Sequence, residues 1–324
     1  MSVPMDEDAT GGGAPRVCVV LKQSSWQRWV DEEADPRILA LLEAGDETVQ
    51  RMRASHVDHI ETIDEVRAAL AELRVESVWS DHPHGFSVEG RCDLVVTVGG
   101  DGTLLGASHG IGTGVPLLGV NSAPDHSVGF FCGASKGHVH AAIGAALRGA
   151  LPRTELTRMS VDLNGRRLFD RVLNESLFCH VSPAATSRYI LRKFDANGRL
   201  QAGEEQKSSG LWVGPAAGST AAQQSAGGRV LPLRSQSLQY VVREPYRPHG
   251  EALELTCGLV DHGEVLAIRS KMKESCLFVD GDHLVAEVTI GDVVEMRRSD
   301  EPLLVLGLGA NGRRRSALGS PAAG

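Results

Sequence analysis

The sequence has few of the features that mark membrane, disulfide-bonded or nucleic-acid-binding proteins. No apolar run approaches the ~20 residues that a membrane span requires, and the six cysteines form no C-x-x-C pair. With 33 Lys and Arg against 41 Asp and Glu, the net charge is −8, which argues against binding to the nucleic-acid backbone. We therefore expect no membrane or nucleic-acid partner, no zinc site or disulfide framework, and a cytoplasmic location with reduced thiols.

Both ends of the 324-residue chain read as tails. Residues 1–15, "MSVPMDEDATGGGAP", lack the apolar core of a signal peptide and the Arg-rich character of a transit peptide. We expect this segment to be disordered and to bury nothing. Residues 313–324 form a second tail that does not end in the peroxisomal Ser-Lys-Leu tripeptide. The length between the tails is sufficient for two domains.

The first half alternates strand and helix patterns. Buried strands are expected at 16–21, 75–79, 93–98 and 115–120, and apolar residues recur at helical spacing over 59–73 and 135–149. Strands separated by helices pair in parallel. This half predicts an α/β domain over residues 16–150 with a mostly parallel sheet.

Hairpin signals dominate the second half. Alternating sequence flanks Asn164-Gly165, Asn197-Gly198 and Asp280-Gly281, and these dipeptides favour tight turns between antiparallel strands. Helical periodicity is mostly absent. We therefore expect a C-terminal β-sandwich domain over residues 151–290.

The segment "DLVVTVGGDGT" ends a buried strand in three glycines around one carboxylate, at Gly99, Gly100, Asp101 and Gly102, followed by Thr103. Glycine permits positive φ and lets a ligand approach the backbone closely, and a helix N-terminus suits phosphate. Leu105 stands where a dinucleotide fingerprint needs its third glycine, and no Walker lysine is present. A carboxylate here could hold a metal or accept a hydroxyl proton. A tight turn with a solvated aspartate is the alternative.

Two other clusters are candidate binding segments. Asn174 and Glu175 interrupt an apolar run, and small hydroxyl residues lie between glycines over 218–228, "GSTAAQQSAGG". Buried polar groups need partners, which a purine, a ribose or a structural hydrogen-bond network would supply; the second cluster could equally be a flexible loop. The histidines lack partners at metal spacing, so we expect surface or structural roles for them (His82, His84, His109, His138 and His140).

Together and in this order, the three clusters resemble the NAD kinase family, with "GVN" (119–121) and "VDG" (279–281) as further family-like segments. The resemblance covers roughly residues 16–307. It implies ATP-dependent phosphorylation of the adenosine-ribose 2′-hydroxyl of NAD(H), Mg²⁺ bound with ATP and no direct protein ligand predicted for it, a homodimer, and a segment over 291–312 that returns to the first domain.

The same resemblance implies roles for individual residues. Asp101 would accept the hydroxyl proton, and Asn174 and Glu175 would contact the dinucleotide. The remaining residues would hold the ATP phosphates (Gly99, Gly100, Gly102 and Thr103) or line the adenosine side of the dinucleotide (Ser219, Thr220 and Ser225). Lys22 and Arg188 could assist. "GGDGT" alone also occurs in 6-phosphofructokinases and in diacylglycerol and sphingosine kinases.

Two further positions that the resemblance assigns to NAD(H) binding, Ser209 and Ala222, depart from the wider family. Ser209 stands where most members have Asp, and Ala222 where most have Tyr. Both departures resemble the plant NADH kinase subgroup, which implies a preference for NADH and admits a peroxisomal location by analogy. The alternatives are a lipid or sugar kinase that shares the glycine-rich turn, or a catalytically silent dinucleotide sensor. The sequence leaves open whether ATP or polyphosphate is the phosphoryl donor.

Overall fold

The structure, a computed structural model, describes residues 14–247 and 252–308. The tail predicted at 313–324 lies outside the described residues, as do residues 1–13 of the tail predicted at 1–15. Pro15 is described, and its carbonyl accepts the N–H of Glu76 at 2.9 Å. The last residue of the predicted first tail therefore pairs with the fold. No described helix combines the length and the apolar composition that crossing a membrane would need.

The first domain contains a mostly parallel sheet, in the order β2-β1-β3-β4-β19-β6 with β5 paired to β4. Every pair is parallel except β19 with β6, which confirms the predicted fold class. The central strand β3 is buried throughout, so its continuous apolar run suits a sheet covered on both faces. The strands are β1 (Arg16–Leu21), β2 (Glu76–Ser80), β3 (Leu94–Gly99), β4 (Pro116–Asn121), β5 (Cys132–Ser135), β6 (Arg153–Leu156) and β19 (Leu303–Leu306).

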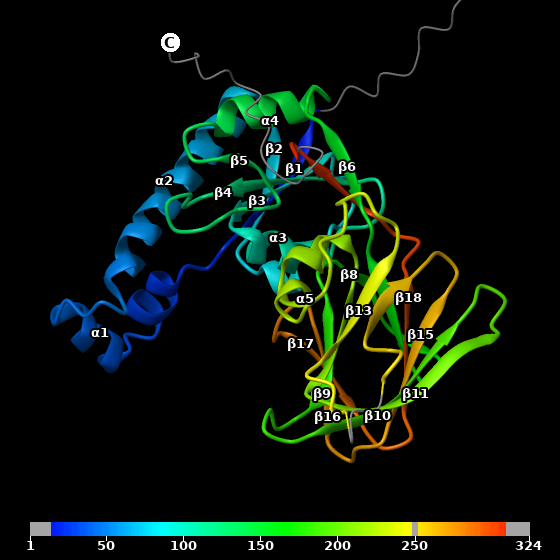
Figure 1. The fold of residues 1–324 in the computed structure, drawn as a ribbon. Coiled ribbons are helices and arrows are strands. Elements are labelled where there is room, and N and C mark those ends of the chain that lie inside the picture. The colour runs from blue at the N-terminus through cyan, green and yellow to red at the C-terminus, as the bar shows by residue number, and fades with distance from the viewer. Residues whose placement is uncertain (1–13, 248–251, 309–324) are drawn as a thin grey trace, which may run out of the picture.

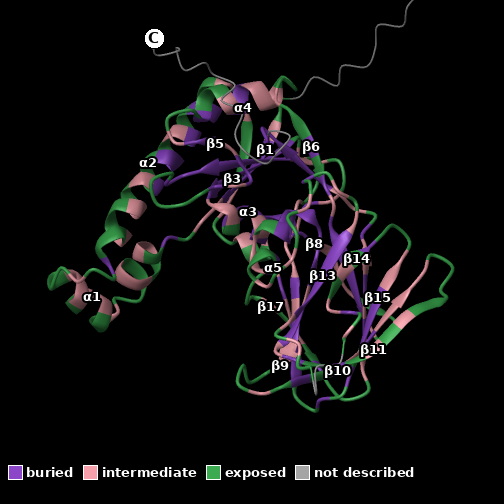
Figure 2. Ribbon diagram, in the orientation of Figure 1, coloured by how far each residue is buried: buried purple, intermediate pink, exposed green. Residues whose placement is uncertain are grey.

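Different elements cover the two faces of this sheet. Helices α2 (Gln50–Glu72) and α4 (Val139–Leu147) pack on the face that carries Val17 and Val19. The opposite face carries Cys18 and Val20 and packs against helix α3 (Asp101–Ser108) and loops of the second domain. Alternate residues of one strand thus serve two cores. Helix α1 (Pro36–Glu43), after the one-turn helix η1 (Gln27–Glu32), extends away from the sheet and buries no residue (Figures 1 and 2).

The second domain is a sandwich of two antiparallel six-stranded sheets, as predicted (Figure 1). Its core consists of inward-facing residues from both sheets, such as Tyr189, Ile268 and Phe178. One sheet has the order β11-β10-β15-β18-β7-β8, with β7 (Met159–Leu163), β8 (Arg166–Val172), β10 (Ser187–Phe194), β11 (Leu200–Ser208), β15 (Val265–Ser270) and β18 (Val293–Arg298). The other has the order β14-β13-β12-β9-β16-β17, with β9 (Ser176–His180), β12 (Gly210–Gly214), β13 (Leu238–Arg243), β14 (Cys257–Val260), β16 (Ser275–Val279) and β17 (Leu284–Val288).

The three predicted hairpins are present. Asn164-Gly165 joins β7 to β8, Asn197-Gly198 joins β10 to β11, and Asp280-Gly281 joins β16 to β17. Asn164 and Asp280 adopt positive φ, at 51° and 50°, as do the glycines that follow them. These turns need left-handed backbone, which explains why Asn-Gly and Asp-Gly occupy them.

The chain passes twice between the domains. Strand β6, at 153–156, still belongs to the first sheet, β18 belongs to the sandwich, and β19 pairs with β4 and β6 of the first sheet. The exact division of the chain at residue 151 stays a prediction. The pairing of β19 shows how the two domains are tied together by sequence-distant segments.

Candidate active site

The glycine-rich turn connects β3 to α3 at the carboxyl edge of the parallel sheet, where ligands bind in such folds. None of its three glycines adopts positive φ, so that reason for glycine does not apply here. A Cβ atom on Gly99 would clash with the Thr103 side chain, and one on Gly100 would lie 3.1 Å from Ser127 Oγ. A Cβ on Gly102 would meet nothing within 4 Å. Close packing explains the first two glycines, and open space at Gly102 suits a bound group.

Asp101 is held by backbone rather than solvated. Its two carboxylate oxygens accept the N–H groups of Phe130 and Phe131, each at 2.8 Å. Each oxygen retains a further acceptor position, because an ionised carboxylate has about four in all. The arrangement fixes the direction of the carboxylate and leaves it able to accept a hydroxyl proton. The Phe130–Phe131 amides are site groups that the sequence did not reveal.

A cavity of about 1000 Å³ opens over this turn. Asp101 and Thr103 lie on its floor, and Lys22, directly after β1, contributes an amine whose pKa is lowered by burial. The wall includes residues from the sandwich as well as from the first domain. The remaining charged and histidine side chains that line the cavity are Arg28, Asp81, His82, His84, Asp280, Asp282 and His283.

His59 of α2 ties the strand ends beside the cavity. This buried imidazole is hydrogen-bonded to the Lys22 carbonyl through Nε2 at 2.8 Å and to Ser122 Oγ through Nδ1 at 3.0 Å. Burial lowers the pKa of His59 to about 4. The neutral ring therefore fixes the segments that follow β1 and β4, which carry Lys22 and Ser122.

Asp280 joins the cavity to the second predicted cluster. The side chain of Asp280 is 2% exposed, and its oxygens accept the N–H groups of Leu173, Asn174 and Glu175 at 2.8–3.1 Å. It also pairs with His109, at the end of α3, at 2.9 Å. One carboxylate thus connects the end of α3 to the Asn174–Glu175 segment. The Asp280-Gly281 turn was predicted as a hairpin and noted as a segment resembling the family, but no site role was predicted for Asp280, and His109 was predicted to be structural.

Asn174 and Glu175 carry unpaired buried atoms. Asn174 Oδ1 and Glu175 Oε2 have no hydrogen-bond partner among the described residues. Burial, followed by the charge of Asp280, raises the pKa of Glu175 from 4.5 to about 8. Buried polar atoms normally find partners, so these two favour a bound ligand with hydrogen-bonding groups.

The predicted third cluster packs directly on the second. It comprises the 3-10 helix η3 (Ala216–Thr220) and the short helix α5 (Ala222–Ser225). A Cβ on Gly218 would clash with the Asn174 carbonyl and lie 2.7 Å from Glu175 Oε2. Ser219 is buried, and its hydroxyl donates to the Ala216 carbonyl and accepts from Leu231 N. Thr220 and Ser225 are exposed and Ala222 is half-buried.

Ser209 lies apart from the other predicted residues. It borders a separate cavity of about 360 Å³ that Arg188 and Lys207 also line. Because Val213 pairs with Ser176 and Leu211 with Phe178, Ser209 lies near the far end of β9, roughly 15 Å from Glu175 at about 3.3 Å per residue. Within one chain, Ser209 and Arg188 are not brought to the Asp101 turn.

Two arginines of the sandwich domain hold the other end of α3. Arg158 is fully buried and donates to the carbonyls of Ser108 and Ile111, both at 3.0 Å. Arg171 donates to the His109 carbonyl at 3.0 Å. Cations at a helix C-terminus complement its partial negative charge, and these bonds fix α3 against the second domain. Nothing in the sequence pattern marked Arg158.

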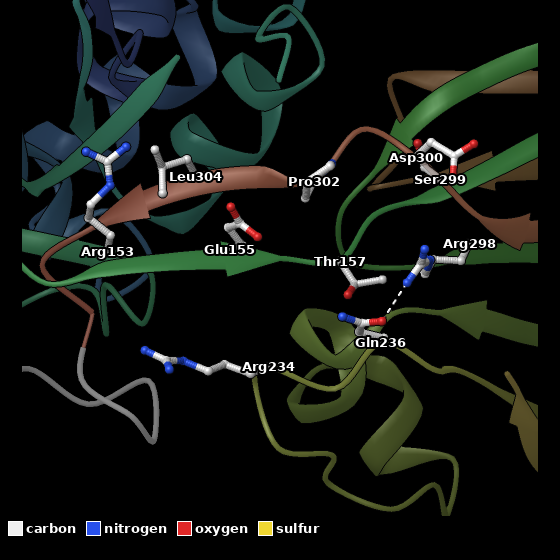
Figure 3. A pocket seen from close by; sticks show the side chains of 10 residues that line it. All are labelled: Arg153, Glu155, Thr157, Arg234, Gln236, Arg298, Ser299, Asp300, Pro302 and Leu304. Carbon is white, nitrogen blue, oxygen red and sulfur yellow. Dashed lines mark hydrogen bonds between the residues drawn. The ribbon is translucent and has the colours of Figure 1, made fainter. Parts of the chain in front are cut away.

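A further cavity, of about 610 Å³, lies over β6 and β19 and contains none of the predicted site residues (Figure 3). Arg153, Arg234 and Arg298 line it together with Glu155 and Asp300, and Arg298 donates to Gln236 at 2.6 Å. The cavity carries both positive and negative side chains, and none of its three arginines is buried. The cavity does not have the one-sided charge typical of an anion site.

The fold and the site together define a nucleotide-dependent phosphotransferase architecture: a glycine-rich turn with a fixed carboxylate, facing a sandwich that carries buried unpaired polar groups. The family model for the ATP-NAD kinase N-terminal domain matches residues 26–148. A probable NADH kinase from Oryza sativa subsp. japonica is 36% identical over 261 residues, covering 76% of this chain and 80% of that protein. The chain belongs to the NAD kinase family.

Other relatives agree with this assignment. The NADH kinase of Arabidopsis thaliana is 36% identical over 228 residues, covering 65% of this chain and 71% of that protein. Two solved structures share the fold at low identity. An NAD kinase from Archaeoglobus fulgidus in complex with ATP has a TM-score of 0.62 and 18% identity, covering 90% of this chain and 92% of that one. Yeast NADH kinase complexed with NADH has a TM-score of 0.64 and 14% identity, covering 93% and 86%.

Proposed function

We propose that the protein transfers the terminal phosphoryl group of ATP to the 2′-hydroxyl of the adenosine ribose of NAD(H), with a preference for NADH. One observation carries the proposal. Asp280 borders the cavity above Asp101 and also holds Asn174 and Glu175, whose buried oxygens lack partners. A phosphate-binding turn is thus joined to a polar pocket of the chemistry that a dinucleotide requires.

In the reaction, Asp101 accepts the proton of the attacking 2′-hydroxyl. The bond between this oxygen and the terminal phosphorus forms as the bond from that phosphorus to the leaving ADP oxygen breaks. The N-terminus of α3 provides backbone N–H groups for the phosphates, next to Gly102 and Thr103. Lys22 lies in the same cavity, where its amine would offset phosphate charge.

Mg²⁺ is proposed to arrive with ATP. Among residues 14–247 and 252–308, no group of three or more His, Cys, Asp or Glu side chains is arranged to hold a metal. Mg²⁺ commonly binds through substrate phosphates, water and one or two carboxylates. Asp81 and Asp282 line the cavity and would be such carboxylates. Bound there, the ion would neutralise charge on the transferring phosphoryl group.

We further propose a homodimer. The separation of Ser209 from Glu175 within one chain supports a dinucleotide site to which a second copy contributes Ser209. A cytoplasmic location is proposed as well, since no disulfide joins the six cysteines, all of which lie among the described residues, as is usual in a reducing compartment. Sedimentation of the purified protein and imaging of the tagged chain test the two statements separately.

A coupled assay with NADH or NAD⁺ as acceptor, and with ATP or polyphosphate as donor, tests the function. We expect NADPH from NADH and ATP, and Asp101→Asn should lower turnover by about 10²–10⁴-fold while NADH affinity stays within several-fold. Tight NADH binding without product would instead identify a dinucleotide sensor. Phosphorylation of diacylglycerol, sphingosine or fructose 6-phosphate in place of NADH would identify a lipid or sugar kinase.

A further inference from the structure

Gln223 of α5 is a buried amide with one polar atom unused. Its side chain is 0% exposed, and Nε2 has no hydrogen-bond partner among the described residues. Leaving a buried polar group unpaired is costly, so a structural role for the whole side chain does not account for it. The unpaired atom needs an explanation from what surrounds it.

The hydrogen-bond network fixes which atom of the amide is free. Gln239 Oε1 accepts the backbone N–H of Arg229 at 2.8 Å, so Gln239 Nε2 is a donor. That Nε2 donates to Gln223 Oε1 at 3.2 Å and to the Arg229 carbonyl at 3.1 Å. The orientation of Gln239 therefore determines the orientation of Gln223. The free atom is the N–H₂ donor, and it points away from Gln239.

This donor lies beside the Asn174–Glu175 segment, which carries two of the unpaired acceptors. A Cβ atom on Gly214 would lie 2.7 Å from Gln223 Nε2, 2.8 Å from Glu175 Cα and against the Asn174 carbonyl. Seven buried side-chain atoms lack partners in the described residues, and three of them belong to Asn174, Glu175 and Gln223. Residues nearly fifty positions apart thus bring an unpaired donor next to the segment that carries two unpaired acceptors.

The pairing of a donor with a carboxyl group selects a particular ligand chemistry. A lone ring nitrogen or a carbonyl could use only the donor. A hydroxyl group can give its hydrogen to the ionised carboxylate and accept from the amide with its lone pairs. A sugar hydroxyl therefore satisfies both residues with a single oxygen atom.

We propose that Gln223 is a dinucleotide-binding residue whose Nε2 donates to a ribose hydroxyl oxygen while Glu175 accepts the hydrogen of the same diol. The inference rests on the proposed function, because it assigns the ligand of the Asn174–Glu175 segment. It adds a contact from a position that, unlike its neighbour Ala222, was not singled out by the family comparison.

The test replaces only Nε2 of Gln223, the atom without a partner. Gln223→Glu keeps Oε1 for Gln239 and replaces the donor by an oxygen that cannot donate when ionised. Gln224→Glu makes the same change one residue further on, where the side chain is exposed. NADH fluorescence titration without ATP gives the dissociation constant, and initial rates give KM for ATP.

We expect the NADH dissociation constant of Gln223→Glu to rise tenfold or more, with KM for ATP and the Gln224→Glu values within twofold of wild type. Gln223→Met, which conserves volume, should weaken NADH binding as well, and it serves if the glutamate variant does not fold. Unchanged NADH affinity in a folded Gln223 variant would overturn the inference. If the wild type itself neither binds nor phosphorylates NADH, the proposed function fails instead.

Discussion

Replacing Glu175 with Gln should stabilise the ligand-free protein, and more so as the pH rises. The pKa of Glu175 is about 8 in the folded protein, against 4.5 for an ordinary glutamate, because burial and Asp280 disfavour its charge. Between these two values the unfolded chain releases a proton that the folded chain keeps. Stability is therefore lost as the pH rises from 4.5 through 8, and it is constant above that range.

The magnitude follows from the shift. At 1.36 kcal/mol per pH unit, a change from 4.5 to about 8 corresponds to a ceiling of about 5 kcal/mol. Glutamine resembles the protonated carboxyl and does not titrate, so the variant avoids this loss. We expect Glu175→Gln to match the wild type within about 1 kcal/mol at pH 5 and to exceed it by at least 2 kcal/mol at pH 8.5.

Urea unfolding of both proteins at the two pH values, without nucleotide, provides the measurement. Glu89→Gln is the matched control, since Glu89 is exposed; its difference in stability from the wild type should be the same at both pH values. An advantage of Glu175→Gln that is equal at pH 5 and pH 8.5 would refute the reasoning.

The same pKa links binding to proton release. If NADH hydroxyls donate to the Glu175 carboxylate, NADH binding favours the ionised form and should release up to one proton at pH 7. Calorimetry of NADH binding in buffers of different ionisation enthalpy measures this number. Affinity should rise with pH between 6 and 8 in the wild type and not in Glu175→Gln. Binding without proton release would mean that Glu175 remains protonated in the complex.

Three further predictions concern other parts of the chain. Ser209→Asp should shift the kcat/KM ratio toward NAD⁺ by roughly fivefold, from about 1 kcal/mol of attraction to the cationic ring, and more at low salt; a wild type that prefers NAD⁺ would contradict the assumed subgroup, and an unchanged ratio would place the cause elsewhere. A chain that begins at Ala14 should keep its Tm and activity, whereas one that begins at Arg16 loses the Pro15 carbonyl bond to Glu76 and should melt slightly lower; an equal and large drop in both would show that the acidic segment docks. Arg158→Met should destabilise the protein by about 3–5 kcal/mol, since it leaves three buried carbonyls without a donor; denaturant unfolding at pH 7 checks this, and a loss under 1 kcal/mol would mean that water replaces the guanidinium.

Local patterns predicted the fold well because they reflect local physics. The strands predicted at 93–98 and 115–120 from continuous apolar runs are β3 and β4, each shifted by one residue, and the sandwich hairpins were predicted from Asn-Gly and Asp-Gly turns that favour positive φ. The resemblance to the NAD kinase family, which the relatives confirm, predicted that Asp101 and the Asn174–Glu175 pair belong to the same site. Neither source gave their mutual geometry.

What the sequence did not predict depends on contacts between distant backbone groups. Asp101 is held by the amides of Phe130 and Phe131, and a backbone N–H has no sequence signature. Asp280 was noted only for its turn and for the "VDG" segment, neither of which indicated the four hydrogen bonds that its carboxylate accepts. Arg158 was not considered because arginines are rarely buried. Ser209 was predicted to share a site with Glu175, but Ser209 precedes β12 at one end of the neighbouring strand β9, and Glu175 lies at the other end.

Strand β19 has a consequence for how the protein is made. It lies between β4 and β6 within the parallel sheet, yet it is formed by residues 303–306, near the end of the chain. A fragment that ends before residue 303 cannot complete this sheet, and the sandwich likewise needs β18, at residues 293–298, so both domains are completed only when almost all of the described chain has been made. A premature stop or a C-terminal proteolytic cut before residue 303 would leave β4 and β6 as unpaired edges, which are sites of aggregation.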